Sequence, residues 1–362
     1  MRDVEAISVE TRLAASLASG RSLAAFRRAL LHWYDENRRD LPWRESRDPY
    51  RIWLSEIMLQ QTRVAAVLDH YRIFLQRFPT AQALAAASED DVLAAWSGLG
   101  YYRRARMLHQ CAKDLVQKHS GRFPQTAEHL QKLPGIGRYT AAAIASIAFN
   151  EAVAVVDGNV ERVLQRLAGI HLKAPQTWQR AQALLDNSRP ADFNQAMMEL
   201  GATVCVPREP RCQSCPVRKW CPTRGRVAQT VSIEHLPASR PAKKQIWCAL
   251  DWRKGEGNAH GHAEIRLVQR PRKASLMPGM WELPQSSKPP RPACAHAHWR
   301  TFRHSITVTD YTVHVLRNTS LRNTPVPTAT PAANGKWIAI DRIALIPITG
   351  LTRKILKAGG II

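Results

Sequence analysis

Apolar residues in the first half of the chain recur at every third or fourth position, from Leu23 to about Phe193. This spacing places them on one face of an α-helix, and Pro or Gly interrupts it about every ten to fifteen residues. No heptad repeat persists, so the helices are expected to pack as a bundle and not as a coiled coil. The pattern predicts a compact, mainly α domain over residues 23–228, preceded by a tail over residues 1–22.

The pattern changes after this domain. Residues 229–245 are polar and contain prolines and a Lys pair, which is typical of a linker. Beyond them, short runs rich in β-branched and aromatic residues are separated by Gly, Pro and Asn, as strands are by turns. The runs are Ile246–Trp252, Ala263–Gln269, Ser305–Leu316 and Lys336–Ile340. We therefore expect an α+β domain over residues 246–362.

The length of 362 residues fits two domains. The longest apolar stretch, Ala141–Phe149, contains one Ser and is far shorter than the ~20 residues of a membrane span. The first residues, Met1-Arg-Asp-Val-Glu, lack the apolar segment of a secretory signal. These features predict a cytoplasmic, monomeric protein with no membrane contact.

The net charge of the chain indicates what kind of partner it binds. The chain has 52 Lys and Arg against 29 Asp and Glu, a net charge of +23, and residues 240–362 alone contribute +14. A surplus of this size indicates a polyanionic partner, for which nucleic acid is the commonest candidate. A surplus that serves only solubility is the alternative.

Four of the seven cysteines lie in one short window, with the spacing Cys205-x6-Cys212-x2-Cys215-x5-Cys221. Four thiolates this close can converge on one centre, which is either an iron–sulfur cluster or a tetrahedral zinc ion. A disulfide framework would instead spread its cysteines over a short secreted chain. The window therefore predicts a metal centre, and its spacing alone leaves the metal open.

A glycine turn, Leu133-Pro-Gly-Ile-Gly-Arg, precedes an Ala-rich helical segment. Gly135 and Gly137 allow the backbone N–H groups to approach a phosphate at the positive end of the helix. The motif favours the hairpin of a helix–hairpin–helix DNA-binding element, with an ordinary helix turn as the alternative.

Two carboxylates have the placement of catalytic groups. Glu56 lies in the otherwise apolar helical segment Trp53–Thr62, where burial would raise its pKa and make it a proton donor near neutral pH. A solvent-facing or ion-paired Glu is the alternative. Asp157 ends an apolar run before Gly158-Asn159 and, on its own, is best explained as a helix N-cap.

Two further segments suit contact with DNA. Gln61 and Thr62 are uncharged hydrogen-bonding residues at the end of the Glu56 segment. The sequence Leu99-Gly100-Tyr101-Tyr102 places aromatic rings beside Arg103 and Arg104, a combination suited to base stacking and phosphate contact.

In combination, these segments resemble the helix–hairpin–helix base-excision DNA glycosylases that carry an iron–sulfur cluster, and among them the MutY-type adenine DNA glycosylases. The similarity runs from about Leu41 to Cys221 and continues more weakly to about Val315. The shared motifs are Leu-Pro-Trp-Arg (41–44), Trp-Leu-Ser-Glu-Ile-Met-Leu-Gln-Gln-Thr (53–62), Gly-Leu-Gly-Tyr-Tyr (98–102), Leu-Pro-Gly-Ile-Gly-Arg (133–138), Val-Asp-Gly-Asn-Val (156–160), Asn-Gln-Ala-Met-Met-Glu-Leu-Gly (194–201) and the four cysteines.

The resemblance implies a role for each matching residue in hydrolysing adenine from duplex DNA that contains adenine paired with 8-oxoguanine or guanine. It implies that a flipped adenine is protonated by Glu56, and that Asp157, Tyr139 and Asn159 stabilise the oxocarbenium-like sugar. The adenine pocket is expected to contain Trp43, Arg44 and Glu199. The expected DNA contacts are Gln61, Thr62, Leu99, Gly100, Tyr101, Gly135 and Gly137. The resemblance also implies a [4Fe–4S] cluster as cofactor, bound by Cys205, Cys212, Cys215 and Cys221.

One position separates this activity from a related one. Bifunctional relatives of the endonuclease III type, which act on oxidised pyrimidines, carry a Lys two residues after the second hairpin Gly and form a Schiff base with it. This chain has Tyr139 at that position, so we expect a monofunctional hydrolase. A non-catalytic DNA-binding protein is a third hypothesis, which would require Glu56 and Asp157 both to be structural.

The second domain resembles the nudix-like module of the same family through Leu276-Met-Pro-Gly-Met-Trp-Glu-Leu-Pro284. A hydrolytic nudix site needs acidic residues for Mg²⁺, and the sequence has none between Leu283 and Thr309. The resemblance therefore implies a role in lesion recognition. In this family a Phe-Ser-His-type loop reads the lesion, and the stretch Phe302-Arg-His304-Ser305 departs from it, with His304 and Ser305 as the expected contacts.

Overall fold

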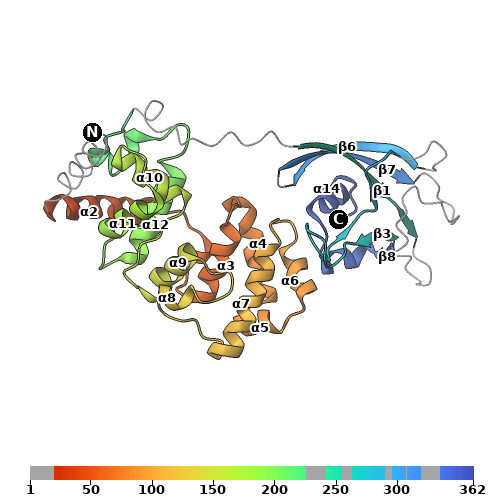
Figure 1. Cartoon of the computed structure of the whole chain (residues 1–362), viewed down its shortest axis with the longest axis horizontal. Coiled ribbons are helices and arrows are strands. Elements are labelled where there is room, and N and C mark those ends of the chain that lie inside the picture. Colours follow the sequence, from red (N-terminus) through yellow and green to blue (C-terminus); the bar gives the residue numbers. More distant parts are fainter. Residues whose placement is uncertain (1–19, 226–241, 255–262, 290–295, 307, 319–334) are drawn as a thin grey trace. The chain divides into compact units, whose positions relative to one another are not determined.

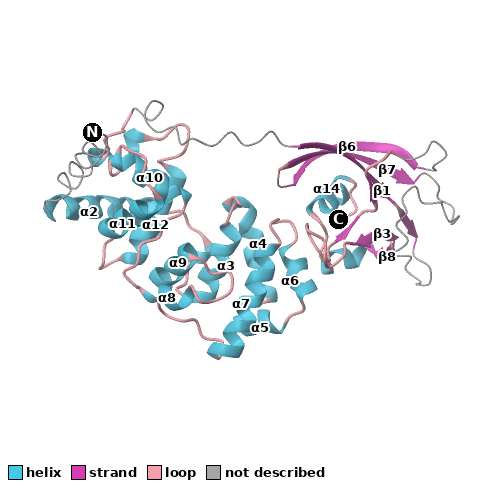
Figure 2. Ribbon diagram, viewed as in Figure 1, coloured by secondary structure: helices cyan, strands magenta, loops and turns pink. Residues whose placement is uncertain are grey.

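The computed structural model describes residues 20–225, 242–254, 263–289, 296–306, 308–318 and 335–362. Within the described residues, helices and turns make up residues 20–225 and every strand follows residue 241, as Figure 2 shows. This division confirms the expected helical domain followed by a sheet-containing one. Most of the predicted tail (1–22) and of the predicted linker (229–245) lies outside the described residues.

The α-helices described between residues 20 and 225 are short, as the breaks in the sequence pattern predict (Figure 1). They are α2 (Gly20–Asn37), α3 (Pro49–Leu59), α4 (Val64–Arg77), α5 (Ala81–Ala86), α6 (Glu89–Trp96), α7 (Arg103–His119), α8 (Ala127–Leu130), α9 (Arg138–Phe149), α10 (Gly158–Ala168), α11 (Ala174–Leu184) and α12 (Pro190–Thr203). Three-residue 3₁₀ turns lie at Pro42–Arg44 (η1), Cys212–Ser214 (η2) and Arg218–Trp220 (η3). No described helix is both long enough and apolar enough to cross a bilayer.

The chain forms two compact units that are not continuous in sequence. The helical unit contains Met1–Tyr71, Thr80–Ala85 and Gln110–His235. The mixed unit contains Arg72–Pro79, Ala86–His109 and Leu236–Ile362, so it combines α6 with the C-terminal sheets. The domain limits expected from the sequence were drawn along the chain and remain a prediction.

Apolar helix faces build the core of the helical unit. One buried cluster joins α2, α10, α11 and α12 through residues such as Phe26, Leu30, Leu164 and Phe193. A second contact packs α3 against α9, whose sequence RYTAAAIASIAF is rich in Ala. Small side chains on α9 let neighbouring helices approach closely, which positions the residues at its first turn.

Two small sheets form the C-terminal part of the mixed unit. One has the order β5-β1-β7-β6, with β1 and β7 parallel and the other pairs antiparallel. The other joins β3 to β2, β4 and β8. The strands are β1 (Ala242–Leu250), β2 (Trp252–Lys254), β3 (Ala263–Gln269), β4 (Trp281–Glu282), β5 (Gln285–Ser286), β6 (His296–Ile306), β7 (Thr309–Asn318) and β8 (Lys336–Ala339).

A buried apolar cluster holds these strands to the helix α14 (Gly350–Ala358), which follows the 3₁₀ turn η4 (Ile340–Leu345). The predicted strand at Ala263–Gln269 coincides with β3. The run predicted over Ser305–Leu316 is divided between the end of β6 and most of β7. Most of β6 was not predicted, because the His and Arg residues that alternate along it obscure the strand pattern.

Candidate active site

Glu56 is a carboxylic acid buried in the helical unit. It lies on α3, which begins at Pro49 after Asp48 caps it by accepting a hydrogen bond from the Tyr50 backbone N–H at 2.9 Å. Its neighbours on the helix are buried and, apart from Ser55, apolar, and Glu56 itself is only 6% exposed. The position is the interior one that the sequence analysis weighed against a solvent-facing Glu.

Its surroundings raise the pKa of Glu56 to about 7. Burial is the largest cause, because a charged carboxylate loses solvation there. A hydrogen bond from Tyr139 lowers the pKa, the charge of Asp157 raises it, and the Arg44 guanidinium lowers it. The balance keeps a substantial fraction of Glu56 protonated at neutral pH, as a general acid requires.

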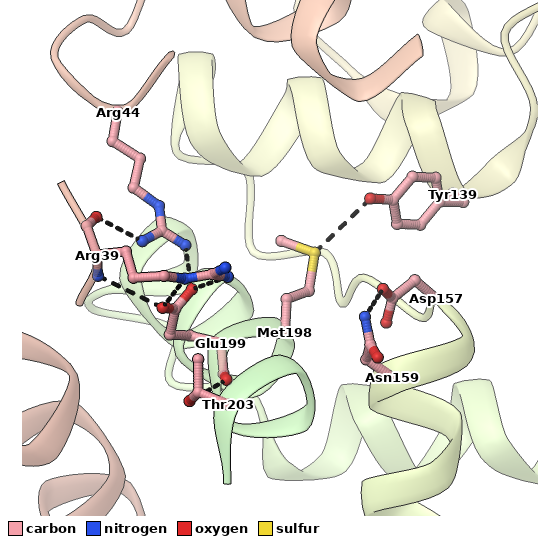
Figure 3. A network of polar contacts seen from close by, with 8 residues as sticks. All are labelled: Arg39, Arg44, Tyr139, Asp157, Asn159, Met198, Glu199 and Thr203. Atoms are coloured by element: carbon pink, nitrogen blue, oxygen red, sulfur yellow. Dashed lines mark hydrogen bonds and ion pairs between the residues drawn. The ribbon is translucent and has the colours of Figure 1, made fainter. Parts of the chain in front are cut away.

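Tyr139 is the partner that holds Glu56. It lies in the first turn of α9, directly after the hairpin turn, and its hydroxyl donates a hydrogen bond to Glu56 Oε2. The hydroxyl also lies 3.7 Å from Met198 Sδ, a contact drawn in Figure 3. Burial, followed by the charges of Glu56 and Asp157, raises the pKa of Tyr139 well above its usual value. Tyr139 therefore remains a neutral donor.

The hairpin turn has the geometry that its glycines suggest. Gly135 has a φ of +75°, which favours Gly, and Gly137 is the N-cap of α9. A Cβ built on Gly137 would meet nothing within 4 Å, so the turn is open on that side. Arg138, the first residue of α9, stacks its guanidinium 3.9 Å from the centroid of the Trp178 ring. The turn and the start of α9 thus present N–H groups and a fixed positive charge.

Asp157 is both an N-cap and a neighbour of Glu56. Its Oδ1 accepts a hydrogen bond from the Val160 backbone N–H at 2.7 Å, which caps α10. Its Oδ2 accepts one from Asn159 Nδ2 at 2.9 Å (Figure 3). The capping interpretation of the sequence is therefore correct. It fixes the orientation of the carboxylate, whose charge acts on Glu56.

Asn159 is fixed by two further residues, Arg162 and Gly201, and neither was given a role from the sequence. Arg162 Nη2 donates to Asn159 Oδ1 at 2.9 Å and to the Gly201 carbonyl at 2.6 Å. Arg162 Nε donates to the carbonyl of Cys205 at 2.9 Å. A Cβ on Gly201 would lie 2.6 Å from Asn159 Cβ, so only Gly fits there. Its three-residue spacing from Asn159 on α10 is the signal that could have identified Arg162.

Glu199 lies on α12 at the centre of a buried ion cluster (Figure 3). Arg39 reaches it through Nε at 2.6 Å and Nη2 at 2.9 Å, and Arg44 through Nη2 at 2.7 Å. Burial raises the pKa of Glu199, but the two guanidinium groups more than offset it, so the pKa is lowered. Arg39 was not predicted, because nothing in its local sequence indicates a partner 160 residues away.

Trp43 lies beside this cluster in sequence, in the turn η1 before α3. Its ring is buried and packs edge-on against Tyr71, with ring centroids 5.4 Å apart. Trp43 and Arg44 therefore come from one short turn with little conformational freedom, which suits the wall of a binding pocket.

The cysteine window follows α12 and wraps against α10. Burial raises the pKa of the Cys215 thiol, the Val217 backbone lowers it, and the thiols of Cys205, Cys221 and Cys212 raise it, to a value of about 11. The four side chains thus share one neighbourhood. Arg166 Nη1 donates to Cys205 Sγ at 3.2 Å. Among the described residues, no three His, Cys, Asp or Glu side chains are grouped as they would be around one metal ion.

The expected DNA contacts fall in both units. In the helical unit, Gln61 lies exposed in the turn after α3 with a φ of +55°. In the mixed unit, Tyr101 has a φ of +48° and is 58% exposed, whereas Leu99 is buried. Ser305 donates to Asp310 Oδ1 at 2.5 Å, which engages the hydroxyl expected to read the lesion. His304 is half-buried, and burial together with the Lys354 charge lowers its pKa.

Comparison with known proteins identifies the family. A model of the HhH-GPD superfamily of base excision DNA repair proteins matches residues 54–189. The human adenine DNA glycosylase is 37% identical over 411 residues, which cover 92% of this chain and 74% of the human protein. The chain belongs to the adenine DNA glycosylase family. The rat adenine DNA glycosylase is 46% identical over 71% of this chain and 52% of its own length.

A solved structure of a thermostable thymine-DNA glycosylase resembles this member of the adenine DNA glycosylase family in fold. It has a TM-score of 0.53 and 30% sequence identity, and the match covers 57% of this chain and 97% of the other. The predicted family, the helical glycosylase fold and the enzyme class are therefore confirmed. The nudix-like character of the C-terminal part and the individual residue roles remain predictions.

Proposed function

We propose that this chain hydrolyses the N-glycosidic bond of adenine paired with 8-oxoguanine or guanine in duplex DNA, as a monofunctional enzyme of base excision repair. The observation that carries the proposal is the buried Glu56 carboxyl, held by Tyr139 and titrating near pH 7. Such a group donates a proton efficiently near neutral pH. Protonation of adenine N7 makes the base a better leaving group.

Access to that proton requires the adenine to leave the base stack, because its glycosidic bond is out of reach inside the duplex. Glu56 then delivers its proton to N7, and its own negative charge is stabilised by the hydrogen bond from Tyr139. The same bond keeps the carboxyl in one orientation throughout. Tyr139 thus supports both the acid and the conjugate base.

Departure of adenine leaves a positive, oxocarbenium-like sugar. Asp157 supplies the compensating negative charge, because its carboxylate is held in one orientation by the α10 N-terminus and by Asn159. Water then completes the hydrolysis. Arg162 and Gly201 fix Asn159 from behind, so the carboxylate meets the sugar without rearrangement.

We assign Glu199 a positioning role in the adenine pocket. A carboxylate has about four acceptor positions. Two are occupied at Oε1, by the Arg39 backbone N–H and Nε, and two at Oε2, by Arg39 Nη2 and Arg44 Nη2. Glu199 is therefore saturated by its own arginines. We propose that it holds Arg44 in place beside Trp43, and that these two side chains contact the base.

We also propose that Cys205, Cys212, Cys215 and Cys221 hold a [4Fe–4S] cluster. Cys205, Cys215 and Cys221 pack against the same apolar cluster of the helical unit, and the charges of Cys205, Cys221 and Cys212 all act on Cys215, which supports a shared centre. The resemblance of the window and its neighbouring motifs to the iron–sulfur glycosylases favours this cluster over a single zinc ion. Bound there, the cluster would fix the loop after α12 by cross-linking it. Iron and sulfide content of the purified protein tests this directly.

We also propose a partner, an oligomeric state and a cellular location for the enzyme. The partner is double-stranded DNA, the enzyme acts as a monomer, and it is cytoplasmic, associated with the nucleoid through DNA. The net charge of +23 supports the DNA partner.

Single-turnover release of adenine from duplexes with adenine opposite 8-oxoguanine, guanine or cytosine tests the function. We expect cleavage of the first two, and loss of turnover with retained DNA binding in Glu56→Gln. Glu36→Gln, which removes an exposed carboxylate paired with His32, is the matched control. Normal turnover in Glu56→Gln would refute the role of Glu56.

The alternative is an endonuclease III-like glycosylase and lyase acting on oxidised pyrimidines. It needs a Lys amine two residues after the second hairpin Gly. This chain has Tyr139 there, and its hydroxyl donates to Glu56. Borohydride reduction should therefore trap no substantial covalent complex with DNA. Efficient trapping would favour the alternative.

A further inference from the structure

A six-residue loop, Ser97–Tyr102, joins α6 to α7 in the mixed unit. Gly98 and Gly100 have φ values of +112° and +71°, and Tyr101 follows at +48°. A Tyr rarely adopts a left-handed conformation, and such a residue persists only where its surroundings impose it. The loop is therefore held in place, and it leaves the Tyr101 ring 58% exposed.

Part of the restraint on this loop comes from the two helices that it joins, α6 and α7. Trp96 Nε1 donates to the Gly100 carbonyl at 3.1 Å. The Arg104 guanidinium lies over the rings of Trp96 and Tyr101, at 5.4 and 5.5 Å from their centroids. Its Nη2 also reaches the carbonyls of Leu99 and Gly100, both at 3.4 Å. These contacts brace the Tyr101 ring and the backbone immediately before it.

The other part comes from the C-terminal end of the chain. Both ends of the loop donate to a single backbone carbonyl, that of Ile348. Ser97 Oγ reaches it at 2.9 Å and Tyr102 Oη at 3.3 Å. Arg353 Nε in turn donates to Ser97 Oγ at 3.2 Å. Ser97 and Tyr102 are 3% and 6% exposed, so these hydroxyls lie away from solvent.

The accepting carbonyl is itself firmly placed. The residues on either side of Ile348 pair with β4, because Trp281 N donates to the Pro347 carbonyl at 2.7 Å and Thr349 N donates to the Trp281 carbonyl at 2.9 Å. Thr349 then caps α14. Because the Ile348 carbonyl is held in this way, its hydrogen bonds restrict the positions of Ser97 and Tyr102.

We propose that the Ile348 carbonyl, Ser97, Tyr102 and Arg353 form a latch through which the C-terminal part of the enzyme holds Tyr101 in the conformation that stacks on DNA. The four residues are positioning residues, and none of them needs to touch the substrate. The proposal rests on the proposed function in one respect, the contact of Tyr101 with DNA. It goes beyond that function in giving the C-terminal part a second role, separate from lesion recognition.

A double-mutant cycle on the full-length, cluster-loaded enzyme tests the latch. The variants are Tyr101→Ala, the latch pair Ser97→Ala/Tyr102→Phe, and their combination. Ser146→Ala is the control, because it removes an equally buried hydroxyl that donates to a carbonyl within α9. The affinity for a duplex with non-cleavable 2′-fluoroadenosine opposite 8-oxoguanine is measured for each. The fluorescence of a 2-aminopurine next to the mispair reports stacking.

Loss of one aromatic stack should weaken binding by about 5- to 100-fold in Tyr101→Ala. The latch pair should cause a similar loss and the same 2-aminopurine change, and adding it to Tyr101→Ala should cost less than about twofold more. Wild-type affinity in the latch pair, or losses that multiply in the combined variant, would overturn the proposal. Tyr102→Phe alone, which keeps the ring, gives the same test should the pair fold poorly.

The result can be separated from failure of the proposed function. Adenine release by the wild-type enzyme tests the function, whereas the cycle measures binding to a substrate that is not cleaved. If Tyr101→Ala binds as tightly as wild type, Tyr101 does not stack on DNA and the latch proposal fails by itself. Arg353→Lys should weaken DNA binding and change the 2-aminopurine fluorescence less than the latch pair does. If Arg353 serves only general stability, neither change occurs.

Discussion

The hydrogen bond from Tyr139 to Glu56 gives a prediction with a definite sign. Tyr139→Phe removes only the hydroxyl that donates to Glu56 Oε2. That bond favours the ionised carboxylate and so lowers the pKa of Glu56 against the effect of burial. Without it, the pKa should rise from its value of about 7. The acid then stays protonated to a higher pH.

The size of the change follows from the bond that is lost. A hydrogen bond to a charged group contributes about 1.5–3 kcal/mol, and about half of that distinguishes the ionised from the neutral acceptor. One pH unit corresponds to about 1.4 kcal/mol. The midpoint of the alkaline limb should therefore move up by about one pH unit. The maximal rate should fall, because Tyr139 also supports the transition state.

The assay is the single-turnover rate of adenine release as a function of pH, with enzyme in excess over DNA. The residual rate of Asp157→Asn, which falls because the charge opposite the sugar is lost, provides a control of opposite sign: the Asp157 charge raises the pKa of Glu56, so its removal should move the midpoint down. An alkaline midpoint that is unchanged or lowered in Tyr139→Phe would show that Glu56 is not the titrating acid.

Three further predictions concern stability, packing and charge. Folding raises the pKa of Glu56 from 4.5 to about 7. The free energy of unfolding is therefore highest below about pH 4.5, where Glu56 is neutral in both states, and it falls as the pH rises to about 7. In urea titrations, Glu56→Gln should thus gain up to about 3 kcal/mol relative to wild type above pH 7, and an equal pH dependence would contradict the burial. Gly201→Ala should displace Asn159 and cut the single-turnover rate at least about tenfold with little change in DNA affinity; an unchanged rate would remove Asn159 from the mechanism. Neutralising four exposed basic residues to Gln should reduce the slope of log affinity against log salt by about 1 or more, and an unchanged slope would mean that this charge is only a solvated surface. The four are Lys243, Lys244, Arg303 and Lys357.

Neutralisation is a better test of the charge than truncation. Removing residues 240–362 would also remove the Ile348 carbonyl and leave the buried hydroxyls of Ser97 and Tyr102 without their acceptor. The salt dependence of a truncated protein would then report a damaged loop as well as lost charge.

Sequence reasoning succeeded where a local motif determines a local structure. The hairpin glycines, the buried helix of Glu56 and the N-cap at Asp157 each follow from a few adjacent residues. The strand β3 was predicted for the same reason, because its apolar pattern is complete within seven residues.

It failed where the partner is distant in sequence. Arg39 meets Glu199 across 160 positions, and Ile348 meets Ser97 across 251. A backbone carbonyl carries no sequence signature at all. Ser305 shows the opposite limit, since its residue type suits DNA contact while its hydroxyl already donates to Asp310 across the β6–β7 pair.

The discontinuous make-up of the mixed unit has a consequence for biosynthesis. Tyr102 is translated 246 residues before Ile348, the residue that accepts its hydrogen bond. At a synthesis rate of about 5–20 residues per second, that interval lasts roughly 12–50 s. During it, the nascent α6 and the start of α7 have no C-terminal partner to cover them. The hydrogen bonds of Ser97 and Tyr102 in this unit must therefore wait until Ile348 has been synthesised, and until then its apolar helical surface is exposed to aggregation.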